Sequence, residues 1–582
     1  MCERSSSRLL HTISVISLLF IIACRQSAPL TNSSLLTKRE RTIGTSGGEI
    51  SLRLTALPKT FNPLLVADEP SLLVNLYLLH ARLVDFNHDT QTWTPALAER
   101  WQAEPDGKTF SIHLREALKF SDGQALTAED VVFTLRALYD ERTGSPLLRD
   151  ALLVNGKPIE VAATDGRTLR LTFPEKVAAP ESYLMNLPVL PRHLLSKAFQ
   201  QGTMSTVWGL SESPDRIVTA GPFVPEALQQ GAYLKLKRNP QYWKKDQNGT
   251  PLPYLDGITL EAISDANNTL LRLTQGTLDL ADRIRASDFA TLQASPGVAR
   301  AYDFGPGLST DYFWFNLNNG KGNPIKKAWF NEARFRRALA HAVDRDAIAR
   351  TTLRGLATPL YGFVSPGNRA WIANDLPRAN YDLDRARKLL QEAGFVFRGS
   401  ADAPELYDQQ GQRIEFTLLV QAENELRKQM AAVMQQDLTK LGITMQVAPL
   451  ETQALMERWE KTFEYDAILM GLTVTDTEPS SYSGFLRSDS PTHQWAPKQP
   501  TPATQWENRI NELVVAQARE ADLSQRQAQF REIQQLMAEQ MPIIPIVSRH
   551  IVSAAHHRLG NYRPSNIFPF SCWNIEELFI RP

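Results

Sequence analysis

The amino-acid sequence predicts an α/β protein of more than one domain, and three observations support this prediction. The chain has 582 residues, more than a single hydrophobic core usually serves. From about residue 305, short apolar strands and amphipathic helices alternate. Residues 414–420, 423–442 and 443–447 form a strand, helix and strand pattern with short links. This pattern predicts two parallel strands joined by a right-handed crossover.

The N-terminus has the pattern of a bacterial secretion signal. Arg4 and Arg8 precede about 15 mostly apolar residues, fewer than the roughly 20 that a transmembrane helix needs. The stretch ends at Ile-Ile-Ala-Cys, which resembles the lipobox of bacterial lipoproteins, so we expect cleavage before Cys24 and a lipid on that cysteine. The polar stretch that follows predicts a flexible tether. An ordinary secretory signal with a chance cysteine is the alternative.

Charge and cysteine content exclude several classes of function. The chain has 63 basic and 63 acidic residues, whereas a nucleic-acid-binding protein needs a basic excess, so we expect no nucleic-acid partner. Cys2, Cys24 and Cys572 offer neither a disulfide framework nor a metal-ligand spacing. The ten histidines show no metal-binding motif, and no phosphate-binding glycine loop is present. We therefore expect no metal and no cofactor.

The most strongly patterned stretch, residues 106–135, raises the question of an active site. Apolar residues alternate over 110–114, which predicts a strand, and a Ser-Asp-Gly turn follows. Thr127 has the position of a helix N-cap, with Asp130 three residues on as an acidic variant of the capping box. The acidic residues Asp122, Glu129 and Asp130 can thus serve turns and the helix start, and we prefer this interpretation to a catalytic pair.

The remaining elements complete the α/β pattern. Residues 50–54 alternate as a strand, and residues 71–84 carry apolar side chains at helical spacing. Residues 465–472 form a buried strand, and the loop after it carries Thr475, Asp476 and Glu478. Loops of this kind, at the carboxyl ends of strands, bind ligands in α/β sheets. Two helices are predicted within 505–540, and residues 541–547 predict a short return strand broken by prolines.

The series of motifs resembles one family along nearly all of the mature chain. In order they are residues 97–101, 106–135, 238–243, 265–280, 333–348 with 355–362, 381–395 and 541–546. This series resembles the family 5 extracellular solute-binding proteins of ABC importers, the oligopeptide- and dipeptide-binding group. The resemblance implies the type II fold of periplasmic binding proteins, with two lobes, a hinge, an interlobe cleft and an extra third domain.

The resemblance also implies a division of the chain into segments. We expect a signal peptide (1–23), a lipidated flexible tether (24–47), lobe I in three parts (48–94, 219–304 and 541–582), an extra domain (95–218) and lobe II (305–540).

The function that the resemblance implies is capture and delivery of a solute. The protein would be a monomeric, lipid-anchored component of the bacterial cell envelope that faces the periplasm or the exterior. It would close around a peptide or peptide-like solute and pass it to the permease subunits of an ABC transporter, without catalysis. Two alternatives stay open: a lipoprotein that presents its ligand to a signalling receptor, and a membrane-tethered secreted hydrolase. The hydrolase would need a nucleophile or an acid pair, and none was found in the sequence.

The expected binding residues follow from two loops of the family. In peptide-binding relatives these loops clamp the peptide backbone, and an aspartate holds its amino terminus. Thr475 stands in the place of that aspartate, with Asp476 one residue later, so a ligand with a free amino group is expected but not secured. A Pro-rich segment also offers Trp495 as a ligand platform or as part of a packed surface loop. The expected binding residues are Ala67, Asp68, Glu69, Gly471, Leu472, Thr473, Thr475, Asp476, Glu478 and Trp495.

Overall fold

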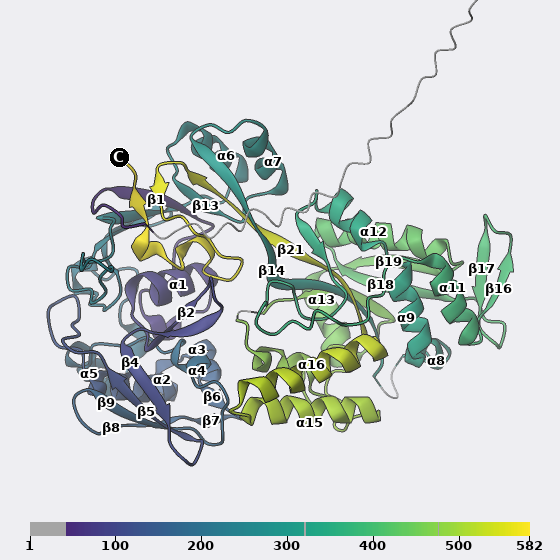
Figure 1. The fold of residues 1–582 in the computed structure, drawn as a ribbon, viewed down its shortest axis with the longest axis horizontal. Helices are drawn as coiled ribbons and strands as arrows, with labels where there is room; N and C mark the ends of the chain where they lie inside the picture. Colours follow the sequence, from purple (N-terminus) through teal and green to yellow (C-terminus); the bar gives the residue numbers. More distant parts are fainter. Residues whose placement is uncertain (1–41, 319–321, 475) are drawn as a thin grey trace, which may run out of the picture. The chain divides into compact units, whose positions relative to one another are not determined.

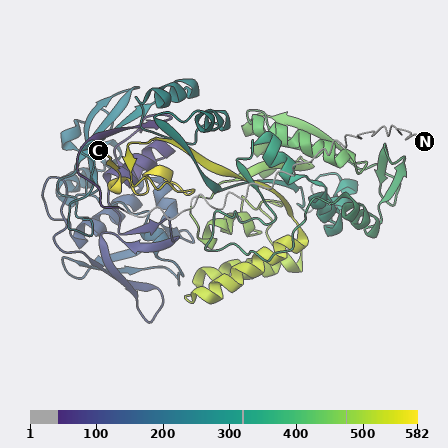
Figure 2. The same ribbon diagram turned by 45° about the horizontal axis from the view of Figure 1, so that its top comes forward.

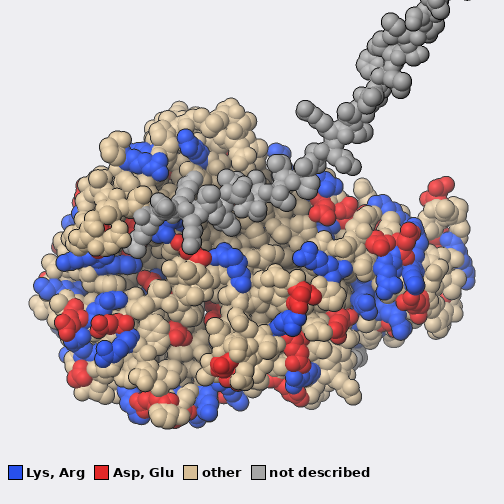
Figure 3. Space-filling view, in the orientation of Figure 1, with Lys and Arg blue, Asp and Glu red and all other residues tan. Residues whose placement is uncertain are grey.

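The computed structural model describes residues 42–318, 322–474 and 476–582. They belong to one compact unit, Arg41–Pro582. The predicted signal peptide and residues 24–41 of the predicted tether, Cys24 included, lie outside the described residues, as does Thr475. Within the described part, no helix is both long and apolar enough to cross a membrane. On the face shown in Figure 3, positive and negative side chains are intermixed, as the equal numbers of basic and acidic residues lead one to expect.

An eleven-stranded mixed sheet forms the centre of the described part (Figure 1). In spatial order its strands are β10 (Phe223–Gln229), β11 (Tyr233–Arg238), β12 (Gly257–Ala262), β1 (Glu49–Leu54), β13 (Leu280–Asp282), β21 (Ile543–His556), β14 (Ala299–Phe315), β20 (Ala467–Leu472), β18 (Glu415–Gln421) and β19 (Thr444–Leu450), with β15 (Ala357–Pro359) paired to β21. The strand predicted at residues 50–54 is confirmed as β1.

Two long antiparallel strands, β14 and β21, join the two ends of this sheet (Figure 1). Their pairing is irregular between Asp303 and Thr310, around the sequence Gly305-Pro306-Gly307. The prediction of a short C-terminal strand broken by prolines is wrong, because β21 runs for 14 residues. Pro545 is tolerated since it lies opposite Tyr312, where the register shifts, and prolines within sheets are found at such bulges.

The predicted strand, helix and strand unit is confirmed. Strands β18 and β19 are parallel and are connected by α12 (Glu425–Thr439), and β20 adds to β18 in parallel. The two predicted C-terminal helices are α15 (Gln505–Arg519) and α16 (Leu523–Gln540), which lie side by side in Figures 1 and 2. The other helices of at least eight residues in the described part are α2 (Ala128–Tyr139), α5 (Arg192–Gln201), α6 (Ala266–Gln275), α7 (Ala286–Ala294), α8 (Pro324–Asn331), α9 (Ala333–Ala342) and α11 (Leu383–Glu392).

The stretch at residues 106–135 contributes one strand to a second, four-stranded antiparallel sheet and then begins helix α2. The strands of this sheet in order are β4 (Ala98–Ala103), β5 (Thr109–Leu114), β9 (Thr168–Thr172) and β8 (Glu160–Ala163). The Asp130 carboxylate accepts hydrogen bonds from the Thr127 amide (2.8 Å) and hydroxyl (2.9 Å) at the start of α2. Asp122 accepts one from the Gln124 amide (3.0 Å) in the preceding turn. The structural interpretation of these two carboxylates is therefore confirmed.

Residues 71–84 depart from the single helix that their spacing suggests. Helix α1 (Glu69–Leu73) continues as a π-helical turn, Val74–Leu79, and the backbone becomes extended at His80. Strand β2 (Val84–Asn87) then pairs with β3 (Thr92–Pro95) to form a hairpin. Because the helix ends early, the residues from Arg82 onward are free to line a cavity.

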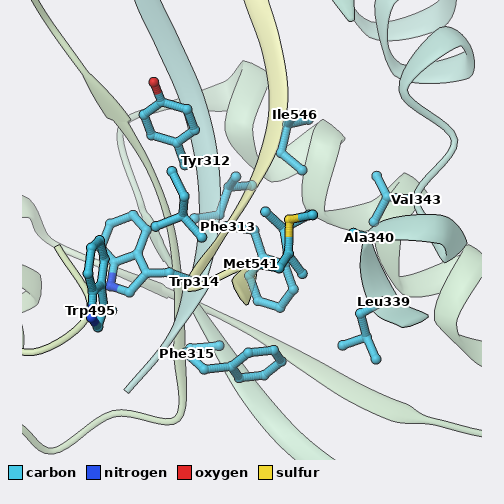
Figure 4. Packing of buried hydrophobic residues seen from close by; sticks show 14 of the residues in the cluster. Tyr312, Phe313, Trp314, Phe315, Leu339, Ala340, Val343, Trp495, Met541 and Ile546 are labelled. Carbon is cyan, nitrogen blue, oxygen red and sulfur yellow. The ribbon is translucent and has the colours of Figure 1, made fainter. Parts of the chain in front are cut away.

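Two large hydrophobic cores support these elements. The first core, between the helices and strands that follow residue 308, contains Tyr312, Phe313, Trp314 and Phe315 of β14 (Figure 4). The second core holds the N-terminal strands, the four-stranded sheet and part of the C-terminus, and it includes Val84 of the hairpin. A smaller third cluster joins α6 and α7 to β14 and β21. Since β14 carries side chains of both the first and the third cluster, it connects separately packed parts of the chain.

Candidate functional site

The loop after β20 places one carboxylate in an unusual position. Asp476 Oδ1 accepts hydrogen bonds from the Ser481 hydroxyl (2.6 Å) and the Glu478 amide (2.8 Å). Its Oδ2 has no hydrogen-bond partner, and no cationic group lies within 4 Å of the carboxylate, among the residues that the structure describes. Burial raises the pKa of Asp476 to about 6, although the bonds from Ser481 and Glu478 oppose this. An acceptor oxygen therefore stays available to a donor from outside the protein.

Asp476 faces residues that are far from it in sequence. It lines a small cavity of about 30 Å³ together with ten other residues. These fall in three parts of the chain: residues 77–93, residue 185 and residues 567–573. These residues are Tyr77, Arg82, Asp85, Phe86, His88, Trp93, Met185, Ile567, Phe568 and Trp573. Five of the ten carry a benzene or indole ring, which is the kind of lining that ligand pockets use, but a volume of about 30 Å³ is far below the roughly 300–1,000 Å³ of a pocket that encloses a small ligand.

A charge pair that also lines the cavity is already neutralised. The Arg82 guanidinium donates to Asp85 and lies 4.3 Å from the centre of the Tyr77 ring. Although burial acts in the opposite direction, Arg82 and Lys244 lower the pKa of Asp85 below its ordinary value. Lys244 in turn pairs with Glu576. These four charges cancel, so the Asp476 carboxylate is the uncompensated charge among the described residues that line the cavity.

His88 contributes a neutral ring to the cavity. Its Nδ1 lies 2.8 Å from the Ser565 hydroxyl, and its ring stacks on Trp573 with 5.1 Å between centroids. Burial lowers the pKa of His88 to about 3, so the ring is uncharged at neutral pH. A neutral imidazole can donate or accept one hydrogen bond without changing the charge of the site.

The other expected residues at the end of β20 and in the loop after it differ in how exposed they are. Gly471 and Leu472 are half-buried at the end of β20, and Thr473 is exposed. Glu478 is buried and pairs with Arg526, so it is a structural anchor of the loop. Among these residues Asp476 alone lines the cavity.

Ala67, Asp68 and Glu69, which were expected to form the other binding loop, lie at the start of α1. Asp68 caps this helix by accepting a hydrogen bond from the Ser71 amide (2.9 Å), and Glu69 pairs with Arg283. Ala67 is exposed. None of the three is among the described residues that line the cavity, so their predicted contact with a ligand stays a prediction.

Trp495 is a core residue in this structure. Its side chain has no exposed surface, belongs to the first core, and donates from Nε1 to Glu507 Oε1 at 2.8 Å (Figure 4). Of the two interpretations of its segment, the structure favours packing against the protein over a ligand platform.

The described residues offer no metal centre, because no three His, Cys, Asp or Glu side chains among them are placed to hold an ion. Cys572 is buried, and burial raises the pKa of its thiol well above the ordinary value, which makes it a poor nucleophile.

Sequence analysis missed the aromatic and charged residues that line the cavity together with Asp476. The available signal was the density of aromatic and charged residues in 82–93, which contains the Asn-His-Asp-Thr turn at 87–90. Assigning a helix to residues 71–84 hid this signal, because Arg82 then belonged to a helix end rather than to a hairpin. Phe568 and Trp573 carried no local signal at all, since they reach the cavity from almost 100 residues after Asp476.

Comparison with known proteins places this geometry in a family. The family model described as bacterial extracellular solute-binding proteins, family 5, middle, matches residues 92–494. The chain belongs to this family. A probable ABC transporter-binding protein of Deinococcus radiodurans is 30% identical over 432 residues, which cover 71% of each chain. The oligopeptide-binding protein AppA of Bacillus subtilis is 25% identical over 553 residues, 93% of each chain.

Solved structures agree with the fold of the family 5 proteins. The substrate-binding protein CtaP of Listeria monocytogenes has a TM-score of 0.73 at 23% identity, covering 92% of this chain and 100% of that one. AppA of Bacillus subtilis in complex with a nonapeptide has a TM-score of 0.64 at 24% identity, covering 93% and 100%. The expected two-lobed type II fold of periplasmic binding proteins is therefore confirmed. A family of solute-binding proteins is also consistent with the expectation that this chain is not an enzyme.

Proposed function

We propose that this family 5 protein is the substrate-binding lipoprotein of an ABC importer, which captures a peptide or peptide-like solute with a cationic amino group. The observation that carries the proposal is the Asp476 carboxylate, which lines a cavity without a cationic partner among the described residues. A ligand ammonium group would supply that partner, and the aromatic walls would cover its apolar part. Relatives described as oligopeptide- and dipeptide-binding proteins support the same class of ligand.

The rest of the proposal concerns organisation and location. Residues 48–94, 219–304 and 541–582 would form lobe I, residues 95–218 the extra domain and residues 305–540 lobe II. A lipid on Cys24 would hold the monomer in the cell envelope, and the closed form would dock on the permease. Separate packing of the first and second cores supports two bodies that can move against each other.

The test is a binding assay with a defined probe. A pool of random tripeptides with free termini is mixed with the purified full chain, and retained peptides are quantified by mass spectrometry after ultrafiltration. Wild type should retain peptides from this pool, and the same pool with acetylated amino termini should be lost. Asp476→Asn should weaken retention at least tenfold, roughly 1.4 kcal/mol. Asp375→Asn, at an exposed ion pair with Arg531, is the matched control.

Two outcomes would contradict the proposal. Equal retention by Asp476→Asn and wild type would remove this carboxylate from the site. Failure of wild type to retain any peptide, while mass spectrometry of the purified protein finds a co-purifying compound of another class, would refute the peptide function. Loss of uptake of the tripeptide pool in a deletion strain, restored by the wild-type gene, would favour transport over the presentation of ligand to a receptor.

A further inference from the structure

One short segment is hydrogen-bonded both to the hairpin β2–β3 and to the loop after β20, each of which brings residues to the cavity. We call residues 367–370 the latch segment and residues 88–91, between β2 and β3, the hairpin turn. The latch segment leads into Trp371 of the first core, whereas the hairpin begins at Val84 of the second core. Phe86, in the same hairpin, packs against the first core instead. The hairpin therefore packs against both cores, and the latch segment is bonded to its turn.

The hairpin turn is bound to the latch segment by four hydrogen bonds. Gln91 Nε2 donates to the Gly367 carbonyl oxygen (2.8 Å), and Gln91 Oε1 accepts from the Ala370 amide (3.2 Å). Arg369 Nη2 donates to the carbonyl oxygens of Asp89 (2.9 Å) and His88 (3.3 Å). Gln91 is buried and adopts a left-handed backbone conformation, with φ of 54°, which few residues other than glycine do. A glutamine with both ends of its amide engaged in this way fixes the distance between the two segments.

The same segment is bound to the loop that carries Asp476. Asn368 has no exposed surface, and its Nδ2 donates to the Thr477 carbonyl oxygen at 2.9 Å. Thr477 directly follows Asp476 in the chain. The latch segment thus holds the backbone beside the cavity carboxylate, and through Arg369 it also holds the backbone of His88, whose residue lines the same cavity.

We propose that the latch segment couples ligand binding at Asp476 to closure of the two lobes, with Gln91 and Asn368 as positioning residues. This inference rests on the proposed function. Closure would bring the hairpin turn onto the latch segment, and the latch segment would then fix the loop of Asp476 through Asn368. A ligand that contacts both Asp476 and the cavity residues of the hairpin favours the same arrangement. Ligand and latch segment would then each stabilise the closed state.

The experiment measures this coupling with and without ligand. Hydrogen–deuterium exchange is followed in the full chain for residues 367–371 and for the loop 476–481, before and after addition of the free tripeptide pool. Retention of the same pool gives the affinity. The two test variants are Gln91→Ala and Arg369→Ala; Arg369 is an exposed residue. The control is Gln102→Ala, at an exposed glutamine of β4.

Gln91→Ala should speed exchange in both segments, the loop 476–481 included, although Gln91 does not bond to that loop. It should also lower peptide retention about five- to thirty-fold, which is the range expected when one or two net hydrogen bonds stabilise only the closed state. Arg369→Ala should act in the same direction, and Gln102→Ala should match wild type.

Unchanged exchange of the loop 476–481 in both Gln91→Ala and Arg369→Ala would overturn the coupling, as would faster exchange with unaltered retention. These results differ from failure of the peptide function itself, in which wild type retains no peptides. In that case exchange of the loop in the ligand-free variants still decides whether the latch segment transmits closure.

Discussion

Glu478 and Arg526 form an almost fully buried ion pair two residues from the cavity carboxylate. Arg526 Nη2 lies 2.7 Å from Glu478 Oε2, and only 5% and 8% of the two side chains is exposed. Arg526 also donates from Nε to the Gln517 carbonyl oxygen (3.1 Å) and covers the Trp371 ring at 4.8 Å. The loop of Asp476 is thus fastened to α15 and α16 by one arginine.

Removing this arginine should destabilise the protein strongly. Arg526→Met leaves the Glu478 carboxylate buried without its partner, and such losses cost about 3–5 kcal/mol. Denaturant unfolding would measure the change. Arg509→Met is the control, because Arg509 pairs with Glu532 on the surface, where an ion pair contributes at most about 1 kcal/mol. A loss as small as that of the control would show that the buried pair does not hold the loop.

Ligand affinity should depend on pH through Asp476. Its pKa of about 6 lies above the ordinary value, so the carboxylate that binds a cation is fully ionised only above about pH 7. Retention of the free tripeptide pool should therefore be highest near pH 7, where the carboxylate is ionised and the ligand's amino group, with an ordinary pKa of about 7.7–8.0, is still charged, and it should fall by up to about tenfold for each pH unit below 5. The raised pKa also means that this group's contribution to stability decreases as pH rises from about 4 to 6.

A second carboxylate serves as the control for this profile. Burial raises the pKa of Asp282 to about 6 as well, but Asp282 bonds to Ser571 and is not among the described residues that line the cavity. Asp282→Asn should keep the pH dependence of retention, whereas Asp476→Asn should lose it. The same slope in both variants would assign the titration to some other group.

Gly367 should not tolerate a side chain. A Cβ atom there would collide with the Pro306 carbonyl oxygen of β14 and lie 2.9 Å from that of Gly307. Because backbone atoms cannot yield as a flexible side chain does, Gly367→Ala should lower the free energy of unfolding by about 1–3 kcal/mol. Gly166→Ala, which meets no atom within 4 Å, is the matched control. Equal unfolding midpoints for the two variants would contradict the close packing of the latch segment on β14.

Cys24 should carry the lipid. Cells grown with radioactive fatty acid should label wild type and Cys2→Ala, because Cys2 lies in the predicted signal peptide that is removed. Cys24→Ala should lose the label. Equal labelling of wild type and Cys24→Ala would show that the lipobox interpretation is wrong.

The elements that the sequence predicted correctly are those fixed by local interactions. Thr127 and Asp130, predicted to form a capping box, meet within one helical turn. The parallel pairing of β18 and β19 also follows from neighbouring elements. In contrast, the length of β21 depends on β13, β14 and β15, which lie far away in the chain. Its prolines suggested a break that the sheet accommodates at a shift of register.

The cavity could be predicted only in part for the same reason. Asp476 follows a recognisable strand, so its loop was found. Arg82 and Trp573 meet it only through the tertiary fold, almost 400 and 100 residues away. For Trp495 the local sequence was recognisable but not decisive. A Pro-rich segment does not determine whether an aromatic ring in it faces a ligand or packs into the first core.

The position of β21 also bears on how the chain is made. This strand lies between β13 and β14 in the middle of the sheet, yet it begins only at Ile543 of 582 residues. The strands on its two sides cannot be joined into one sheet until almost the whole polypeptide has emerged, because sheet pairing between distant segments must wait for the later one. Loss of the last 40 residues would leave two separate groups of strands.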